Sequence, residues 1–441
     1  MSVNKRIWTL TTAIVLTLST FATNLLALQA SGVRAETDRT WYLAGEAMTV
    51  SVTDDNALIA YAELCDTRGL AAGVVIGLNE DRREGVKRHG TGIIELPSDL
   101  HSGYYLLSVY TRNNAQVSQR LVAVINPLRK SKDDDIEWVV DSLECIVESV
   151  EFLRPSGSKR AELERATAVP DALDSRAVAE LEGHVIMARV RNVYDGQTFK
   201  GSQICPSLSI VGKQIHYFEG QMVNDTLAVF HTFGIHGKLP LVLSAMSSSG
   251  ISLPIEMISP FATLLPKQLP HLVFHYKRSE VEARSLDMQR HQMIKSSDEN
   301  QATEVPLDYD DTAYGTKPDL TYNLDEYRQF RTVREVLLEY VLCVRNTKIN
   351  GVPRLIVRKE EDRYDSTLPS LVLIDGMPVN DVERLQNYDA RRVHYINIYG
   401  GQYTFGNGVY NGILSLVTRS GRLTNYPTEP NVQYLEYDFP N

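Results

Sequence analysis

The chain has 441 residues, of which 43% are hydrophobic and 23% charged, with a formal net charge of −10. This composition is that of a globular protein, and the length predicts two to four domains, each with its own apolar core. An acidic chain is repelled by phosphate backbones and anionic lipids, so nucleic-acid binding and electrostatic membrane docking are excluded as main functions.

Residues 1–35 form a segment of their own. Lys5 and Arg6 precede an apolar, Thr-rich run that extends to about Leu28, and small residues follow at Ala30 and Ala35. This order is typical of a Sec-type signal peptide, with cleavage after Ala30 or Ala35. A retained anchor helix is the alternative, because the run is nearly long enough to span a bilayer.

Without this leader the chain carries 42 basic against 55 acidic side chains. Four cysteines fall in the exported part, where disulfides are permitted, and their spacing fits neither a zinc site nor a CxxC redox pair. They are Cys65, Cys145, Cys205 and Cys343. We expect buried free thiols on strands, with one disulfide as the alternative.

Short apolar runs separated by turn residues fill the region from Thr40 to Asn126, as in MTVSV, YYLLSVY and LVAVI. Strands at this spacing predict a β-sandwich. A second series of such runs lies between Leu181 and His275, in HVIMARVRN, SLSIVGK, TLAVFHTFG, LPLVLSAM and HLVFHY, and predicts a second β domain.

Helices are predicted in three places. Apolar residues recur every three or four positions from Ile136 to Val150, the stripe of an amphipathic helix. Residues 279–294 have a helical pattern, and Thr332 with Glu335 forms a capping box that should start a helix near Val333. Residues 156–179 are predicted to be an exposed linker, and residues 295–311 a polar, acidic and mobile segment.

The region from Leu368 to Gly421 predicts a small βαβ unit with an added strand. An apolar strand ends at Asp375-Gly376, a short helix spans 381–386, and strands follow at 392–399 and 413–418. The glycines of this region should permit positive φ and close crossings of the backbone. They are Gly376, Gly400, Gly401, Gly406, Gly408 and Gly412.

These segments resemble a family of exported Bacteroidetes proteins. WYLAGEAMTVSV and ELPSDLHSGYYLLSVYTRN resemble its macroglobulin-type N-terminal domain, ELEGHVIMARV its immunoglobulin-like repeat, and YGTKPDLTYNLDEYRQFRTVREVLLEYV the segment before its plug-like domain. IDGMPV, DARRVHYINIYGG and GNGVYNGILSLVTRSG are similar to the plug of a TonB-dependent outer-membrane receptor. The resemblance assigns the plug-like motif to Asp375, Gly376, Pro378, Gly400, Gly406, Gly408 and Gly412. Only 20 residues follow Gly421, which cannot supply the receptor's barrel.

The resulting fold class is mainly β and multidomain: two β-sandwich domains, of macroglobulin and immunoglobulin-like type, followed by a small α+β plug-like domain. The predicted domains are a signal peptide (1–35), a macroglobulin-type sandwich (36–127), a helical connector and linker (128–180), an immunoglobulin-like domain (181–276), a helical and acidic connector (277–362), the plug-like domain (363–423) and a C-terminal strand or tail (424–441).

No nucleophile elbow, HExxH helix, P-loop or dinucleotide fingerprint is present, so we predict no enzyme, no cofactor and no metal. His271 and His275 share one face of a strand, and a metal-dependent hydrolase completed by His216, His231 or His236 is the third hypothesis for function. The acidic triplet Asp308, Asp310 and Asp311 lacks the glycine and closing glutamate of a calcium loop.

The expected function is non-catalytic contact with other proteins in the periplasm or at the periplasmic face of the outer membrane, in a TonB-dependent or secretion-type complex. Edge strands and the plug-like unit would offer backbone for a partner strand. The plug-like unit either acts as a soluble module or docks onto a separate barrel. The second hypothesis is a carbohydrate- or peptide-binding accessory of an uptake system, supported by the aromatic residues of IYGGQYTFGNGVY and of the tail.

Overall fold

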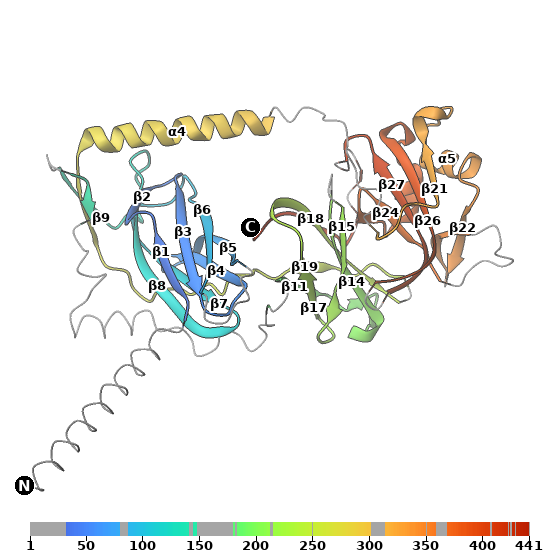
Figure 1. Ribbon diagram of the computed structural model, residues 1–441, viewed down its shortest axis with the longest axis horizontal. Helices are drawn as coiled ribbons and strands as arrows, with labels where there is room; N and C mark the ends of the chain where they lie inside the picture. Colours follow the sequence, from blue (N-terminus) through green and yellow to red (C-terminus); the bar gives the residue numbers. More distant parts are fainter. Residues whose placement is uncertain are drawn as a thin grey trace, which may run out of the picture. The chain divides into compact units, whose positions relative to one another are not determined.

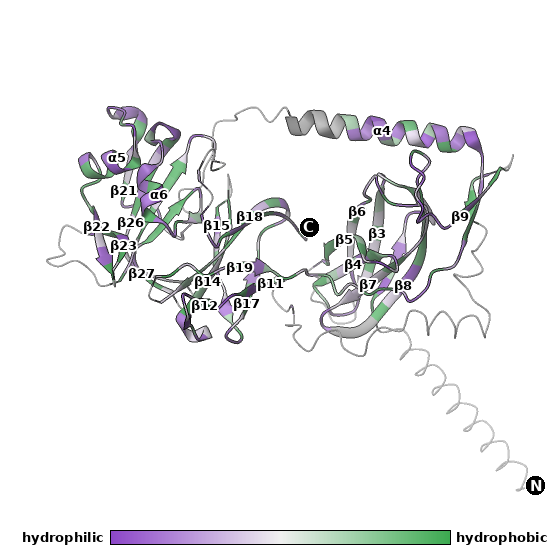
Figure 2. Cartoon of the chain, turned by 180° about the vertical axis from the view of Figure 1, so that it is seen from behind, coloured by the Kyte–Doolittle hydropathy of each residue, from purple (hydrophilic) through white to green (hydrophobic). Residues whose placement is uncertain are grey.

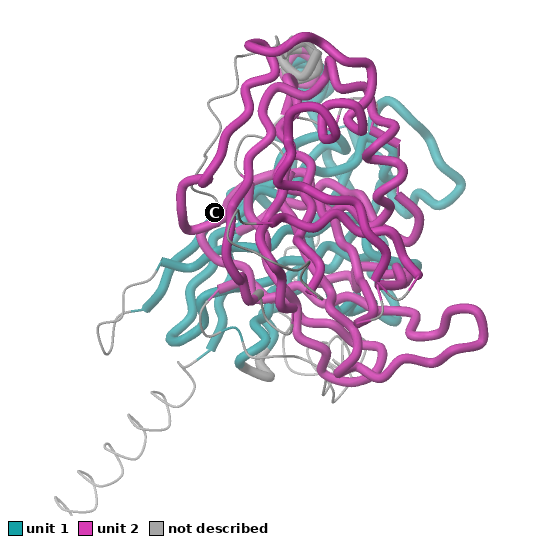
Figure 3. The backbone as a smooth tube through the Cα atoms, turned by 90° about the vertical axis from the view of Figure 1, so that its right-hand side faces the viewer, with its two compact units in different colours: residues 1–181, 261–289 teal, residues 182–260, 290–441 magenta. Residues whose placement is uncertain are grey.

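The computed structural model describes residues 32–79, 87–140, 144–147, 180, 183–211, 215–248, 250–300, 314–349, 351–358, 368–405, 408–421, 423, 426–427 and 429–440. The predicted leader, the linker at 156–179 and the acidic triplet at 308–311 therefore lie outside the described residues, apart from the leader's last four. The chain forms two compact units, residues 1–181 with 261–289 and residues 182–260 with 290–441 (Figure 3). Each unit consists mainly of β-strands (Figure 1), which confirms the predicted mainly β, multidomain class.

Unit 1 contains a β-sandwich. Its strands are β1 (Arg34–Thr37), β2 (Trp41–Leu43), β3 (Ala47–Asp54), β4 (Ile59–Cys65), β5 (Leu70–Gly77), β6 (Arg88–Glu95), β7 (Gly103–Thr111) and β8 (Asn114–Ile125). One sheet has the order β1-β3-β6 and the other β2-β8-β7-β4-β5. Alternation along β3 places Met48, Val50 and Val52 in the core between the sheets. Strand β1 begins at Arg34, so the sandwich includes residues that the sequence assigned to the leader.

A third, small sheet completes unit 1 and corrects one prediction. The segment expected to be a helix from Ile136 to Val150 contains strands instead, β9 (Ile136–Val140) and β10 (Ile146–Val147). Both pair with β20 (Leu272–Tyr276), which the sequence had assigned to the second β domain. The reason is tertiary: the segment is rich in β-branched residues, and β20, distant in sequence, provides the ladder of hydrogen bonds that such residues favour.

The outer face of the five-stranded sheet carries a second core of unit 1. Trp41, Tyr104 and Leu106 from this sheet pack with Phe274 of β20 and Val281 of α4 (Arg278–Asn300). α4, coloured mostly as hydrophilic in Figure 2, confirms the helix predicted for residues 279–294. Its Arg284 lies 3.9 Å from the centre of the Trp41 ring and pairs with Glu46.

Unit 2 begins with a second β-sandwich. Its strands are β11 (His184–Val190), β12 (Val193–Tyr194), β13 (Gln197–Thr198), β14 (Ile204–Ile210), β15 (His216–Glu219), β16 (Gln221–Met222), β17 (Leu227–Thr232), β18 (Gly237–Ser247) and β19 (Ile255–Met257). The two sheets have the orders β16-β17-β11-β19 and β15-β14-β18-β28. Strand β28 (Gln433–Phe439) is the predicted C-terminal strand, and it buries Tyr437 and Phe439 in the core of this sandwich.

The C-terminal domain of unit 2 has a five-stranded sheet of order β21-β26-β27-β24-β25 and a separate hairpin, β22-β23. The strands are β21 (Leu320–Asn323), β22 (Val344–Ile349), β23 (Val352–Val357), β24 (Leu371–Ile374), β25 (Met377–Pro378), β26 (Val393–Phe405) and β27 (Gly408–Thr418). Helix α5 (Val333–Glu339) has the predicted capping box, and α6 (Val382–Asn387) confirms the short helix.

The predicted order of strand, helix and paired strands between Leu368 and Gly421 is present, with one difference in pairing. β24 runs parallel to β27, the last strand, while β26 is antiparallel to β27 and is not a neighbour of β24. The unit is therefore a mixed sheet. Its core is continuous with the second sandwich, since Val211 and Val242 pack among the buried residues of the C-terminal domain.

Candidate interaction site

The residues of the predicted motif form a tight turn at the end of β24. Asp375 and Gly376 connect Ile374 to Met377 as a two-residue hairpin loop, with φ of 47° and 86°. Positive φ at both central residues is the geometry of a type I′ turn, which Asp-Gly favours. Pro378 lies next to this turn on β25 and is buried.

The side chain of Asp375 joins three parts of the C-terminal domain. It accepts hydrogen bonds from the backbone N–H of Thr418 (2.7 Å), the Thr418 hydroxyl (2.6 Å) and the N–H of Leu423 (3.0 Å). Burial raises the pKa of this carboxyl, while these donors act in the opposite direction. Asp375 is thus a buried structural carboxylate, which agrees with its interpretation as a turn former.

The glycines of the motif allow close approach, although not all in the expected way. Gly376 and Gly412 have positive φ, and a Cβ would lie 2.6 Å from Ile215 at the first and 2.8 Å from the carbonyl of Tyr399 at the second. Gly400 and Gly408 lie in extended strands without positive φ, which corrects the prediction for those two. Instead, their N–H groups bind the carboxylates of other segments: Gly400 binds Asp319 at 2.5 Å, and Gly408 binds Glu219 at 2.7 Å. Gly406 lies outside the described residues.

The motif therefore anchors the C-terminal domain on the second sandwich. Gly376 contacts Ile215 and Gly408 binds Glu219, and both partners belong to the second sandwich. An exposed feature of the same domain, the hairpin β22-β23, was not predicted from the sequence. The dipeptide Asn350-Gly351 between two strand-like runs was the available signal.

The outer edge of β22 is open. The backbone N–H of Arg358 donates to the carbonyl of Cys343 (2.8 Å), so these two residues form a hydrogen-bonded pair. Such pairs alternate along an antiparallel ladder, and the backbone groups of Arg345, Thr347 and Ile349 are therefore the ones bonded to β23. The backbone groups of Asn346 and Lys348 then point away from β23, because directions alternate along an antiparallel strand. Within the described part of the chain no other strand pairs with β22.

The surroundings of this edge are apolar at one end and basic along the strand. Leu342 lies two residues before β22 and is 75% exposed, and Leu338 on α5, four residues before Leu342, is 64% exposed. Arg345 and Lys348 on β22 are exposed as well. We call Leu338, Leu342 and the outward-facing β22 the β22 edge. Backbone groups, leucines and positive charges together suit an extended polypeptide with an apolar and an acidic part.

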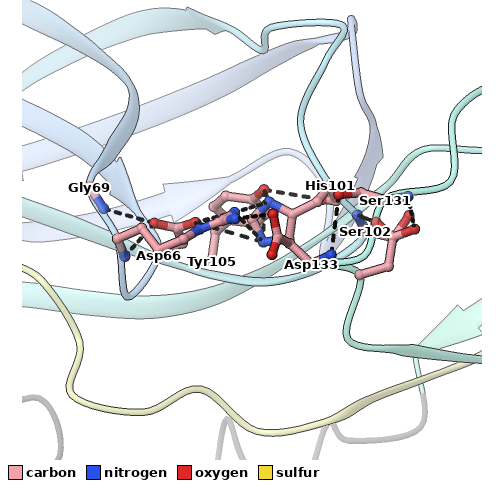
Figure 4. A network of polar contacts seen from close by, with 9 residues as sticks. Asp66, Gly69, His101, Ser102, Tyr105, Ser131 and Asp133 are labelled. Carbon is pink, nitrogen blue, oxygen red and sulfur yellow. Dashed lines mark hydrogen bonds and ion pairs between the residues drawn. The ribbon is translucent and has the colours of Figure 1, made fainter.

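A second polar cluster, in unit 1, contains a carboxylate and a histidine (Figure 4). Asp66 accepts from the N–H groups of Arg68 (2.8 Å) and Gly69 (2.9 Å), and Arg68 and the hydroxyl of Tyr105 both contact His101. Burial opposes ionisation of Asp66, but these donors hold its pKa below the usual value. Burial, and then the charge of Arg68, lowers the pKa of His101. The two groups are thus an ionised carboxylate and a neutral imidazole.

This cluster holds loops together. Arg68 also pairs with Asp133 (2.6 Å), and Asp134 accepts from the N–H groups of Ser102 (2.7 Å) and Ser131 (2.8 Å). The turn after β4, the residues before β7 and the segment before β9 are joined in this way. These contacts connect carboxylates, a guanidinium, an imidazole and backbone N–H groups of three loops, which is the arrangement of a structural network.

The histidines of the metal hypothesis lie in different units. His271 and His275 belong to unit 1, where His271 contacts the carboxylate of Asp135, while His216, His231 and His236 belong to unit 2. Over the described ranges, no group of three or more His, Cys, Asp or Glu side chains is arranged to hold a metal ion. Cys65, Cys145, Cys205 and Cys343 are all free thiols, but only Cys65 and Cys205 lie on strands.

The hollows of unit 2 include a groove and a small cavity. A groove of about 460 Å³ runs along α6 and is lined by Asp381, Glu383, Arg384, Asn387, Tyr388, Asp389, Arg392 and Pro427. A smaller cavity of about 50 Å³ is lined by residues of β14, β18, β23 and β24 and by residues 378–380. Three aromatic residues of IYGGQYTFGNGVY, considered above as a support for sugar binding, pack in one apolar cluster, where Tyr399 is buried and Tyr403 and Tyr410 are partly buried.

Comparison with known proteins adds little to this geometry. No protein-family model and no curated protein matches the chain. Among solved structures, the BSP domain of a biofilm-associated protein is 11% identical with a TM-score of 0.17, over 54% of this chain and 30% of that one. The collagen adhesin CNA from S. aureus is 8% identical with a TM-score of 0.10, over 56% and 93%. Likenesses at these TM-scores support no argument.

None of the helices in the described ranges combines the length and the apolar character that a membrane-spanning segment requires.

Proposed function

We propose that this protein is a non-catalytic, exported binding protein that contacts another polypeptide through its C-terminal domain. The compartment is the periplasm or the periplasmic face of the outer membrane, reached through the N-terminal leader at residues 1–35. The two β-sandwiches serve as the scaffold. The C-terminal domain, similar in sequence to a receptor plug, carries the contact.

The single observation that supports this proposal is the open β22 edge. The backbone groups of Asn346 and Lys348 face away from the hairpin, and a partner strand would satisfy them. Edge strands are usually covered or made short, because an open edge invites pairing with other chains. Lys348 and Arg345 suppress pairing with random apolar strands and select an acidic one.

The partner is thus an extended segment that combines an apolar residue, placed against Leu338 and Leu342, with acidic residues along β22. An outer-membrane barrel or a secretion component with such a segment is the expected source. Binding through one strand buries little area, so a transient complex is expected.

The test is a pull-down from outer-membrane extracts with the full chain and two variants. Asn346→Pro removes an outward N–H without touching the hairpin's own bonds, and Leu342→Ser removes the exposed apolar contact. Leu286→Ser, at an exposed leucine of α4 in unit 1, is the matched control. We expect the wild type and the control to recover a barrel or secretion component, and the two β22 variants to lose it. Equal recovery by all four proteins would reject the β22 edge.

Carbohydrate or peptide binding is the second candidate, favoured by the polar groove along α6. Carboxylates, an amide and a tyrosine in one groove are suited to hydroxyl groups of a sugar. Glycan-array binding by the wild type that is lost in Asn387→Ala, without any protein partner in the pull-down, would favour this function over strand addition.

A further inference from the structure

The cavity of about 50 Å³ in unit 2 contains a buried charge. Arg354 on β23 lines it and is only 8% exposed. The guanidinium donates to the carbonyl of Gly250 (2.6 Å) and to that of Pro353 (3.2 Å), and it lies 3.7 Å from the sulfur of Met246. Among the described residues none of these partners is acidic.

Such a charge is costly to bury without a counter-charge. A guanidinium has five N–H donors and cannot lose its proton, so carbonyl dipoles alone compensate it poorly. Burial lowers the pKa of Arg354, and within the described ranges no charged group acts against this effect. The glycine at position 250 nevertheless leaves room for the Arg354 side chain. Gly250 has φ of 83°, and a Cβ there would lie 1.9 Å from Nη2 of Arg354.

The rest of the lining is mixed: apolar side chains such as Leu355, Val372 and Val382 lie beside several polar ones, and one of these is incompletely bonded. Ser207, Ser244 and Asn380 face the same cavity. The Asn380 amide nitrogen lies near the hydroxyls of Ser244 (3.2 Å) and Ser252 (3.3 Å), whereas its Oδ1 is buried with no partner in the described part of the chain. Both hydroxyls can donate, so the amide can turn and place its N–H₂ group where Oδ1 now lies.

We propose that this cavity is a binding site for a small monovalent anion of about the size of chloride. About 10–15 Å³ of such space holds one water molecule, so 50 Å³ is sufficient for an ion of one to a few heavy atoms such as chloride. The anion supplies the counter-charge that Arg354 lacks and accepts from the Asn380 amide and the serine hydroxyls. The site lies where the second sandwich meets the C-terminal domain, so occupancy stabilises their junction.

The test measures the thermal unfolding midpoint of the full chain in sodium chloride against sodium gluconate, at equal ionic strength. A ligand that binds only the folded state raises the midpoint as its concentration increases, so chloride should raise it by a few degrees and gluconate should not. Arg354→Gln should abolish the difference between the salts. Arg345→Gln, at an exposed arginine of the same hairpin, is the control and should retain it.

A direct readout covers the case in which Arg354→Gln does not fold. Wild-type crystals soaked in bromide should show an anomalous peak within hydrogen-bonding distance of the Arg354 guanidinium. Water molecules at this position without an anomalous peak would overturn the proposal. A chloride response that persists unchanged in Arg354→Gln would overturn it as well.

Discussion

Single residues in this protein act mainly by fixing where chain segments cross. Gly376 illustrates the point, because its positive φ makes the Asp-Gly turn and its missing side chain leaves room for Ile215. Gly315 has nearly the same φ, 84° against 86°, but no atom lies within 4 Å of its ideal Cβ. Comparing a substitution at the two positions therefore separates the cost of backbone strain from the cost of a steric clash.

We predict that Gly376→Ala costs about 2–4 kcal/mol of unfolding free energy, the sum of strain and a clash with Ile215. Gly315→Ala should cost only about 1 kcal/mol, since strain alone applies there. Urea unfolding of both variants measures the difference. Equal costs would show that the approach of Gly376 to Ile215 contributes nothing.

Glu63 fastens the segment Phe261–Leu264 to the first sandwich. Its carboxylate accepts from the N–H groups of Leu264 (2.5 Å) and Thr263 (2.9 Å) and from the hydroxyl of Tyr110 (3.2 Å). Burial is the largest influence and raises the pKa above its ordinary 4.5, while these three donors lower it in part. The folded chain thus binds this proton more tightly than the unfolded chain.

The sign of the pH effect follows from this difference. The stabilising contribution of Glu63 is complete below about pH 4.5 and is lost as the pH rises towards the raised pKa of the folded state. Glu63→Gln has no proton to lose, so its destabilisation relative to wild type should be larger at pH 4 than at pH 7. Denaturant unfolding at both pH values tests this, and a destabilisation that grows with pH would contradict it.

At the scale of elements, the C-terminal strand completes a sheet that begins some 200 residues earlier. β28 pairs with β18 along seven residues, and Phe439 is 1% exposed in the sandwich core. We predict that Phe439→Ala costs about 3–5 kcal/mol. Glu436→Ala, on the same strand at an exposed ion pair with Lys238, should change stability by about 0.5 kcal/mol or less. Equal effects in urea unfolding would exclude β28 as part of the core.

Local signals explain which elements could be predicted from the sequence. The capping box of Thr332 and Glu335, the Asp375-Gly376 turn and the alternating tail are decided by neighbouring residues, and the structure contains all three. The helix expected from Ile136 is wrong because the segment is rich in β-branched residues and pairs with β20, which lies far away in the sequence. Partners so distant in sequence leave no local trace.

In the candidate site too, features with a local sequence signal could be predicted, and features that depend on distant residues could not. The glycine motif was identified, but its role as an anchor depends on Ile215 and Glu219, which no pattern connects with it. The β22 edge had a local signal in Asn350-Gly351, whereas its openness depends on the absence of a neighbouring strand in the described fold. The buried Arg354 has no sequence signal, because its guanidinium contacts Met246 of β18 and Gly250, about 100 residues earlier in the chain.

In the whole molecule, the two sandwiches are the proposed scaffold, and β22 of the C-terminal domain is the proposed contact strand. The domains of unit 2 share a core through Val211 and Val242, so the C-terminal domain is held firmly by the second sandwich. A rigid support reduces the entropy that an edge loses when a partner strand is added. The central claim is therefore that partner binding occurs at β22.

Hydrogen exchange of the full chain, with and without the partner recovered from outer-membrane extracts, tests this claim most directly. We expect the exposed amides of Asn346 and Lys348 to exchange rapidly in the free protein and to become protected on binding. The exchange rates of the amides in the α6 groove should remain unchanged. Protection at the groove with continued rapid exchange at Asn346 and Lys348 would contradict it.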